Sequence, residues 1–199
     1  MATHQSDADA PVLSSRVEAP AELSLDRPFI ITVHVKLESS PGKNARPMIF
    51  HTHRVHSAFE LFRRRPGSGN DTVWEECPCD ETQGFLIVDD PDKRVLVSSH
   101  EDFSSLRPGE TWSDEYAVHH PSGGDIPADA AAGDRFRVRF AGVELDWWDW
   151  GDAEEHGTRG TEVSLPCFVK GDVTDPRHND GRPRVRIAAS NDVEFVVKG

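Results

Sequence analysis

Apolar and polar residues alternate along many short segments of this chain. The clearest is 29–38, FIITVHVKLE, in which every second residue from Ile31 to Leu37 is aliphatic. A period of two places successive side chains on opposite faces of a β-strand. This segment is therefore predicted to be a strand with one face in a core and the other in water.

Segment 134–141, DRFRVRFA, repeats the pattern with arginines at the alternate positions. Phe136, Val138 and Phe140 are expected to face inward, with Arg135, Arg137 and Arg139 facing outward. Further strands are predicted at 47–54, 58–64, 72–76, 84–89, 94–98, 111–118, 143–147, 162–169, 184–188 and 193–197.

The segments between these strands carry turn residues rather than a helical period. RPGSGN, DDPDK, RPGE and HPSGGD supply Gly for positive φ and Pro for fixed φ. The expected class is all-β with little helix: an antiparallel β-sandwich, immunoglobulin-like or jelly-roll, of about ten short strands. Residues 1–19 are expected to be a mobile N-terminal arm, and residues 20–199 a single sandwich domain.

Two neighbouring segments carry a family resemblance. SLRPGETWSDEYAV and IPADAAAGDRFRVRF each place a Gly turn ahead of an alternating strand. In this order they resemble the later strands of immunoglobulin-like and fibronectin-like sandwiches. The longer pattern that continues to WWDWG and a late LPC strand is similar to uncharacterised fungal all-β proteins. That resemblance implies a fold and no activity.

Net charge bears on the binding partners of the chain, and the number of cysteines bears on its location. The chain has 35 acidic and 22 basic side chains and a net charge of −13, which disfavours binding to nucleic acid and to anionic membranes. The one dense basic run, 63–65, is interpreted as a solvated strand end. No signal peptide or bilayer-length apolar run is found. Because the chain has only three cysteines, an odd number, a reducing, cytoplasmic location is expected.

The stretch DWWDWG, residues 146–151, concentrates three of the five tryptophans. If the alternation from Val143 continues, Trp147 lies in the core and Trp148 lies among carboxylates on the other face. Tryptophan faces stack on rings and cations, and aspartates orient polar groups. The main hypothesis is a β-sandwich that binds a small molecule or a protein partner through this end, using Trp147, Trp148, Trp150, Asp146 and Asp149.

A second hypothesis is a small cofactor-free enzyme. Asp146, Asp149 or His156 would transfer protons in an aromatic-lined pocket, as in a cyclase or isomerase. No nucleophile elbow, phosphate-binding loop or dinucleotide fingerprint is present, and no cofactor is expected.

A third hypothesis rests on IFHTHRVHSAFE. His51 and His53 are expected to point the same way from one strand, with His56 or Glu60 as a further metal ligand. The His-x-His pair resembles that of cupins, which implies a metal-dependent enzyme. Glu60 lies farther from the second histidine than in cupins, and the second cupin motif is missing.

Overall fold

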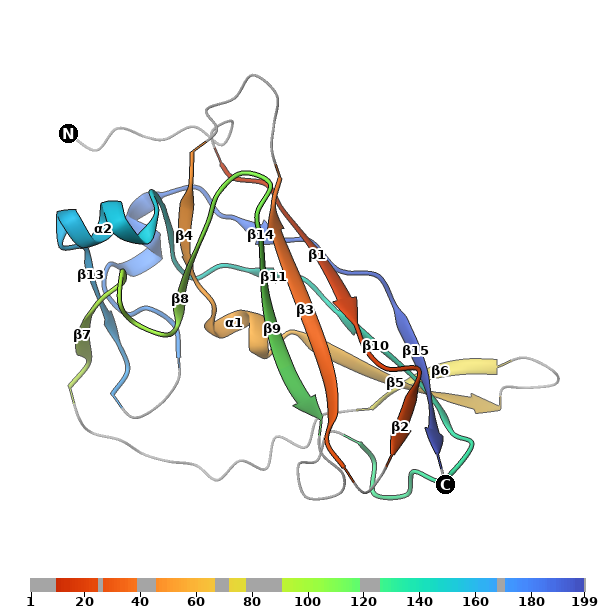
Figure 1. Cartoon of the computed structure of the whole chain (residues 1–199). Coiled ribbons are helices and arrows are strands. Elements are labelled where there is room, and N and C mark those ends of the chain that lie inside the picture. Colours follow the sequence, from red (N-terminus) through yellow and green to blue (C-terminus); the bar gives the residue numbers. More distant parts are fainter. Residues whose placement is uncertain are drawn as a thin grey trace.

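The fold is mostly β, as the residue pattern predicts (Figure 1). The computed structural model describes residues 10–24, 27–38, 46–66, 72–77, 91–118, 126–167 and 171–198. Within these ranges there are fifteen strands, more than the ten or so expected. The predicted strand at 84–89 lies outside the described residues. No helix in the described ranges is long and apolar enough to cross a bilayer.

The first sheet has five strands in the order β11 (Val143–Glu144), β14 (Arg186–Ile187), β1 (Leu13–Glu18), β3 (Phe29–Leu37) and β9 (Thr111–Val118). Along β3 the residues are alternately buried and half-exposed or exposed, so the predicted inner face is confirmed.

The second sheet has the order β2 (Glu22–Ser24), β15 (Val193–Lys198), β10 (Arg135–Phe140), β5 (Phe59–Pro66) and β6 (Thr72–Cys77). Along β10 the three apolar residues are buried and the three arginines are half-exposed or exposed, as predicted.

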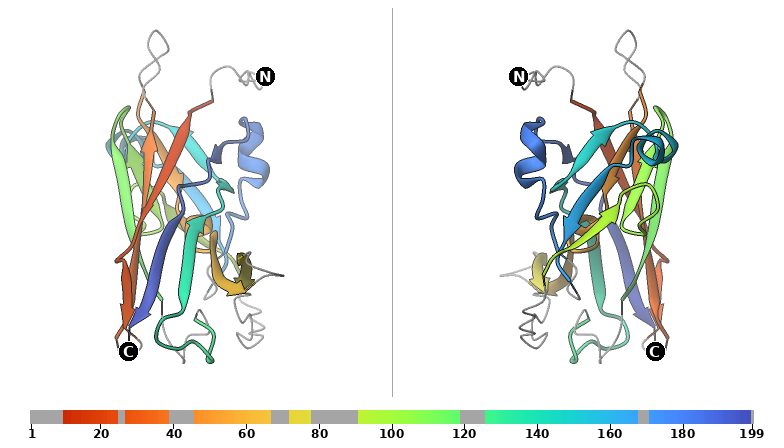
Figure 2. Two further views of the ribbon diagram at one scale, coloured as in Figure 1. Left: turned by 90° about the vertical axis from the view of Figure 1, so that its right-hand side faces the viewer. Right: turned by 90° about the vertical axis from the view of Figure 1, so that its left-hand side faces the viewer.

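The two five-stranded sheets face each other across one hydrophobic cluster (Figure 2). It includes Val33 and Val35 from the first sheet and Phe136, Val138 and Phe195 from the second. Most strand pairs are antiparallel, but β1 runs parallel to β14 and β15 runs parallel to β2. The expectation of purely antiparallel sheets is therefore wrong for these two pairs.

A third, smaller sheet has a central strand that is buried on both faces. Its order is β12 (Trp148–Trp150), β4 (Met48–His51) and β8 (Phe103–Leu106). All four residues of β4 are buried. Met48 and Phe50 join the cluster between the large sheets, whereas Ile49 joins a second cluster on the other side. That second cluster is closed by a two-stranded sheet of β13 (Glu162–Leu165) and β7 (Lys93–Leu96).

Three short helical elements complete the described chain: α1 (His53–His56), α2 (Ala153–Arg159) and η2 (Arg177–Gly181). The start of α2 is fixed by the Asp152 side chain, which accepts a hydrogen bond from the Glu155 backbone N–H at 3.1 Å. The next residue after α2, Gly160, is left-handed at φ 63°. With 7 residues, α2 is too short for a helical period to be recognisable in the sequence.

Two sequence-based expectations need correction here. The predicted mobile arm extends too far, because residues 13–18 form β1 between β14 and β3, with Leu13 and Val17 buried. The basic run is only partly solvated, because Arg63 is buried and bonds Asp129 at 2.7 Å and Asp134 at 2.6 Å. Alternation places the middle of the three arginines, Arg64, outward.

The position of β1 generates a stability prediction. Val17→Ala should lower the free energy of unfolding by about 2 kcal/mol, because Val17 is buried in the core. Val12→Ala is the matched control, since Val12 is 57% exposed and its loss should change stability by less than about 0.5 kcal/mol. Urea unfolding measures both. Equal effects would mean that residues 13–18 do not pack as described.

Candidate functional site

The tryptophan segment is a bend followed by a short strand. The strand expected at 143–147 ends at Glu144, and β12 begins at Trp148. Between them the backbone N–H of Leu145 bonds the Val185 carbonyl at 2.9 Å, and the Trp147 carbonyl accepts from the His51 backbone N–H at 3.0 Å. The bend therefore carries Asp146 and Trp147 to the end of β4.

Trp147 and Trp148 are both 1% exposed. They lie in different clusters, Trp147 with Phe103 and Trp148 with Phe50. The Trp148 indole N–H donates to the Pro183 carbonyl at 2.9 Å. Alternation thus places the two rings on opposite sides of the chain, but a hydrophobic cluster covers each side. The prediction that Trp148 lies on an open carboxylate face is wrong, and neither ring offers a free stacking surface.

The end of the segment is held by arginines. The Arg46 guanidinium lies 5.7 Å from the centroid of the half-buried Trp150 ring. One Asp149 oxygen accepts from Arg182 at 2.9 Å, and the other accepts from the Trp150 backbone N–H at 2.7 Å. These groups already have partners within the chain.

A left-handed turn covers Trp148. His178, Asn179 and Asp180 have φ of 52°, 51° and 53°, and Gly181 follows at 73°. Left-handed backbone costs about 1–2 kcal/mol per non-glycine residue. Asn179 is buried, and its side-chain oxygen accepts from the Trp148 backbone N–H at 3.1 Å. The strain is offset by a hydrogen bond that would otherwise be missing in the core.

His51 and Asp146 form a buried pair. His51 Nδ1 and Asp146 Oδ2 are 2.7 Å apart, and the two side chains are 1% and 4% exposed. The same oxygen accepts from the Val173 backbone N–H at 2.8 Å. Asp146 Oδ1 is buried and bonds no described residue. Phe103 stacks on the His51 ring with centroids 4.9 Å apart.

His53 lies beside this pair. Its ring stacks on His51 with centroids 5.7 Å apart, although His51 ends β4 and His53 begins α1. Burial lowers the pKa of His53, and the neighbouring His51 lowers it further, against the opposite effect of Asp146, Asp172 and Asp102. His53 is therefore neutral at neutral pH. Below, "the His51–Asp146 centre" means His51, His53 and Asp146.

Arg54 and Asp172 close one side of the centre. Arg54 Nε and Nη2 bond the two Asp172 oxygens at 2.7 and 2.5 Å, and Nη1 donates to the Glu144 carbonyl at 3.1 Å. The Arg54 hydrogen bond holds the pKa of Asp172 below its usual value. No sequence pattern indicates that Arg54 and Asp172 pair, because 118 residues separate them.

The predicted metal ligands do not converge. His56 Nδ1 lies 3.0 Å from Asp114 on β9, and Glu60 bonds Arg139 on the outer face of the second sheet at 2.7 Å. Only His51 and His53 remain neighbours. Within the described residues, no three His, Cys, Asp or Glu side chains are arranged to hold a metal ion.

The predicted catalytic carboxylates and histidine are separately engaged. Asp146 bonds His51, Asp149 bonds Arg182, and His156 Nδ1 lies 3.0 Å from Thr161 Oγ1. His156 is fully buried, and burial lowers its pKa. Its ring lies edge-on to Trp147. Asp146 is thus paired with His51, a residue that was predicted to be a metal ligand.

Comparison with known proteins does not assign a family. No family model and no curated protein matches the chain. Among solved structures, β-glucosidase from Listeria innocua with isofagomine aligns at a TM-score of 0.32 and 12% identity, covering 95% of this chain and 16% of that one. A mutant of that enzyme with laminaribiose aligns at 0.31 and 11%, with the same coverage. Likeness at this level carries no argument about fold or function.

The left-handed turn generates a prediction of opposite effects at adjacent positions. Asp180→Gly should raise the free energy of unfolding by about 0.5–1 kcal/mol, because glycine relieves the strain at an exposed residue. Asn179→Gly should lower it, because it removes the buried amide that bonds Trp148. Denaturant unfolding compares the two variants. Stabilisation by both would show that the amide hydrogen bond contributes less than the backbone strain released at Asn179.

The lowered pKa values of His53 and His156 generate a pH prediction. The unfolded chain binds protons at these histidines near pH 6.5 and the folded chain only at lower pH. The contribution of these two histidines to the free energy of unfolding is therefore fully present above about pH 6.5 and is lost as the pH falls below that value. His53→Gln should flatten this dependence in urea titrations at several pH values. An unchanged slope would contradict the burial of His53.

Proposed function

We propose that the chain binds a small polar molecule at the His51–Asp146 centre. The observation that carries this proposal is the second oxygen of Asp146. It is buried without a partner among the described residues, although the other oxygen accepts two hydrogen bonds. A buried acceptor left unpaired costs about 1–3 kcal/mol, and more when it is charged. A ligand that donates a hydrogen bond to Oδ1 would recover that energy.

The neighbouring groups define the class of ligand. Neutral His53 can accept a hydrogen bond at one ring nitrogen and donate from the other. Asp146, Asp172 and Asp102 act to raise the pKa of His53 against burial and His51, so these three carboxylates would attract a positively charged group on a ligand. The proposed ligand therefore carries a hydroxyl group or a protonated amine. Small-molecule binding thus remains the main proposed function. The proposed binding site is the His51–Asp146 centre instead of the tryptophan surface.

The tryptophans have a positioning role in this proposal. Trp147 fixes the end of β4 through its carbonyl and packs against Phe103, which in turn stacks on His51. Trp148 anchors the opposite side of the same sheet. Ligand specificity then belongs to the imidazole and carboxylate groups rather than to the indole faces.

Proton transfer at the same centre is the second candidate function, as in a cofactor-free cyclase or isomerase. It is favoured by the hydrogen bond between His51 and Asp146. Because Nδ1 of His51 bonds Asp146, Nε2 is the ring nitrogen that could exchange a proton with a ligand. His53 would pass the proton to or from the ligand.

We also propose that the two large facing sheets form an immunoglobulin-like sandwich. In this proposal the third sheet is an insertion that lies between the edge of the sandwich and the two-stranded sheet. The shared cluster between the large sheets supports this. A cytoplasmic location is supported by the free thiols of Cys77 and Cys167.

The binding proposal is tested with ethanolamine, which carries both donor groups. Differential scanning fluorimetry should show a saturable rise in melting temperature for the wild type, since a ligand that binds only the folded state stabilises it. The rise should disappear in Asp146→Asn and in His53→Gln. His34→Gln, on β3 and outside the centre, is the matched control and should keep it.

Native mass spectrometry of protein purified from its own host extends the test to retained metabolites. A bound small molecule that is lost in His53→Gln but kept in His34→Gln supports the proposal. Protein that carries no molecule and does not respond to ethanolamine or to other small amines and diols would overturn it. Water would then be the partner of Asp146 Oδ1, and the centre would be structural.

A further inference from the structure

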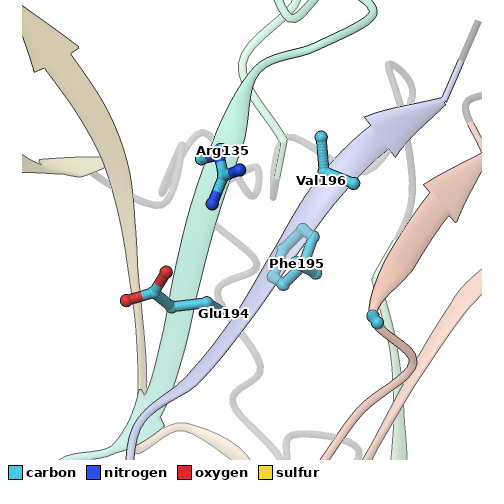
Figure 3. Close-up of a pocket in the computed structure, with 5 residues that line it drawn as sticks. Arg135, Glu194, Phe195 and Val196 are labelled. Carbon is cyan, nitrogen blue, oxygen red and sulfur yellow. The ribbon is translucent and has the colours of Figure 1, made fainter.

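A hollow of about 120 Å³ lies on the outer face of the second sheet. It is lined by Ala21, Arg135, Glu194, Phe195 and Val196. Arg135 on β10 is paired with Val196 on β15, and Glu194 precedes Val196 by two residues, so all three project from the same face. Figure 3 shows Arg135 projecting from β10 and Glu194 from β15, with Phe195 and Val196 beside them. The hollow is therefore bordered by one cationic and one anionic side chain.

Both of these charged side chains lack a partner. Arg135 and Glu194 are exposed, and neither forms an ion pair or a hydrogen bond with another residue that the structure describes. They do not bond each other. Arg137 lies directly across from Glu194, but its guanidinium pairs with Asp192 at 3.1 Å. Two opposite charges thus remain available at the border of the same hollow.

The rest of this face is charge-balanced. Glu60 lies across from Arg139, and the two bond at 2.7 Å. Glu76 lies across from Phe62 on the same face. Such a surface attracts neither anions nor cations strongly. A ligand that carries both signs can use Arg135 and Glu194 together.

The spacing of the two charges suits a zwitterion. Arg135 and Glu194 are diagonal neighbours across an antiparallel strand pair, and such positions lie about 7–8 Å apart. A carboxylate bonds a guanidinium, and an ammonium group bonds a carboxylate, at about 2.7–2.9 Å. A molecule with both groups on one carbon atom fills the remaining gap. The walls of the hollow would displace water from one side of that molecule, which strengthens both contacts relative to a flat surface.

We propose that this hollow binds the zwitterion of a small α-amino acid. Arg135 holds its carboxylate, Glu194 holds its ammonium group, and Ala21 and Val196 contact its side chain. A cavity of about 150 Å³ holds a molecule the size of benzene. A hollow of about 120 Å³ therefore accommodates a small aliphatic amino acid such as L-alanine. This inference is independent of the His51–Asp146 centre.

The probe is L-alanine, added to isotope-labelled protein and followed by NMR. The wild type should show saturable shifts of the backbone amide signals of Ala21 and Val196, which line the hollow. N-acetyl-L-alanine lacks the ammonium group, and ethylamine lacks the carboxylate. Each should bind at least about tenfold more weakly than L-alanine, because it loses one charge-assisted contact.

Arg135→Gln and Glu194→Gln should each weaken L-alanine binding at least about tenfold. Neither should lower the melting temperature, because both residues are exposed. Arg94 and Glu162 provide the matched control. They occupy the same diagonal positions on β7 and β13, but they bond each other at 3.2 Å. Arg94→Gln and Glu162→Gln should leave the affinity within about twofold of the wild type.

Asp146→Asn separates this site from the His51–Asp146 centre. It should keep L-alanine binding, although it is expected to abolish the response to ethanolamine. The proposal is overturned by the absence of saturable shifts at Ala21 and Val196, by equal losses in the control variants, or by equal affinity for N-acetyl-L-alanine or ethylamine. Loss of L-alanine binding in Asp146→Asn would also overturn it, because the amino acid would then bind at the other centre.

Discussion

The complete burial of β4 is the constraint on which the rest of the structure depends. A strand with one wet face can alternate polar and apolar residues, but Met48–His51 has a core on each side. One side is closed by the two large sheets and the other by β7 and β13. A polar residue in such a strand needs a partner inside the protein. His51 meets that requirement through Asp146, and the bend at 145–147 brings Asp146 within reach.

The same constraint accounts for the backbone strain near residue 179. Burial of Trp148 takes its backbone N–H away from water, and the acceptor comes from a segment 31 residues later in the chain. The left-handed turn places the Asn179 amide at that position. A local penalty in the backbone is therefore offset by satisfaction of a polar group in the core. The side-chain nitrogen of Asn179 remains buried without a partner among the described residues, so the compensation is partial.

Much of the fold could be predicted from local alternation, and the site could not. The faces of β3 and β10 follow directly from their period of two. The pattern LSSRVE of β1 is too weakly apolar to indicate a strand, and its place in the sheet comes from neighbours on both sides. For Trp147 and Trp148 the alternation is correct, but no sequence pattern reveals that both faces of a sheet are covered. His51 and Asp146 are 95 residues apart, and their pairing exists only after the sheets have packed.

The parallel pairing of the terminal strands has a consequence for the timing of folding. β1 lies between β3 and β14, and β15 lies between β2 and β10, so strands from the two ends of the chain occupy inner positions in the large sheets. Contacts between residues so far apart in sequence slow folding, because long loops must close before the contacts stabilise anything. During synthesis β1 and β2 emerge long before β14 and β15, the strands that pair with them in parallel. The first sheet can be completed only after β14 has left the ribosome, and the second only after β15 has.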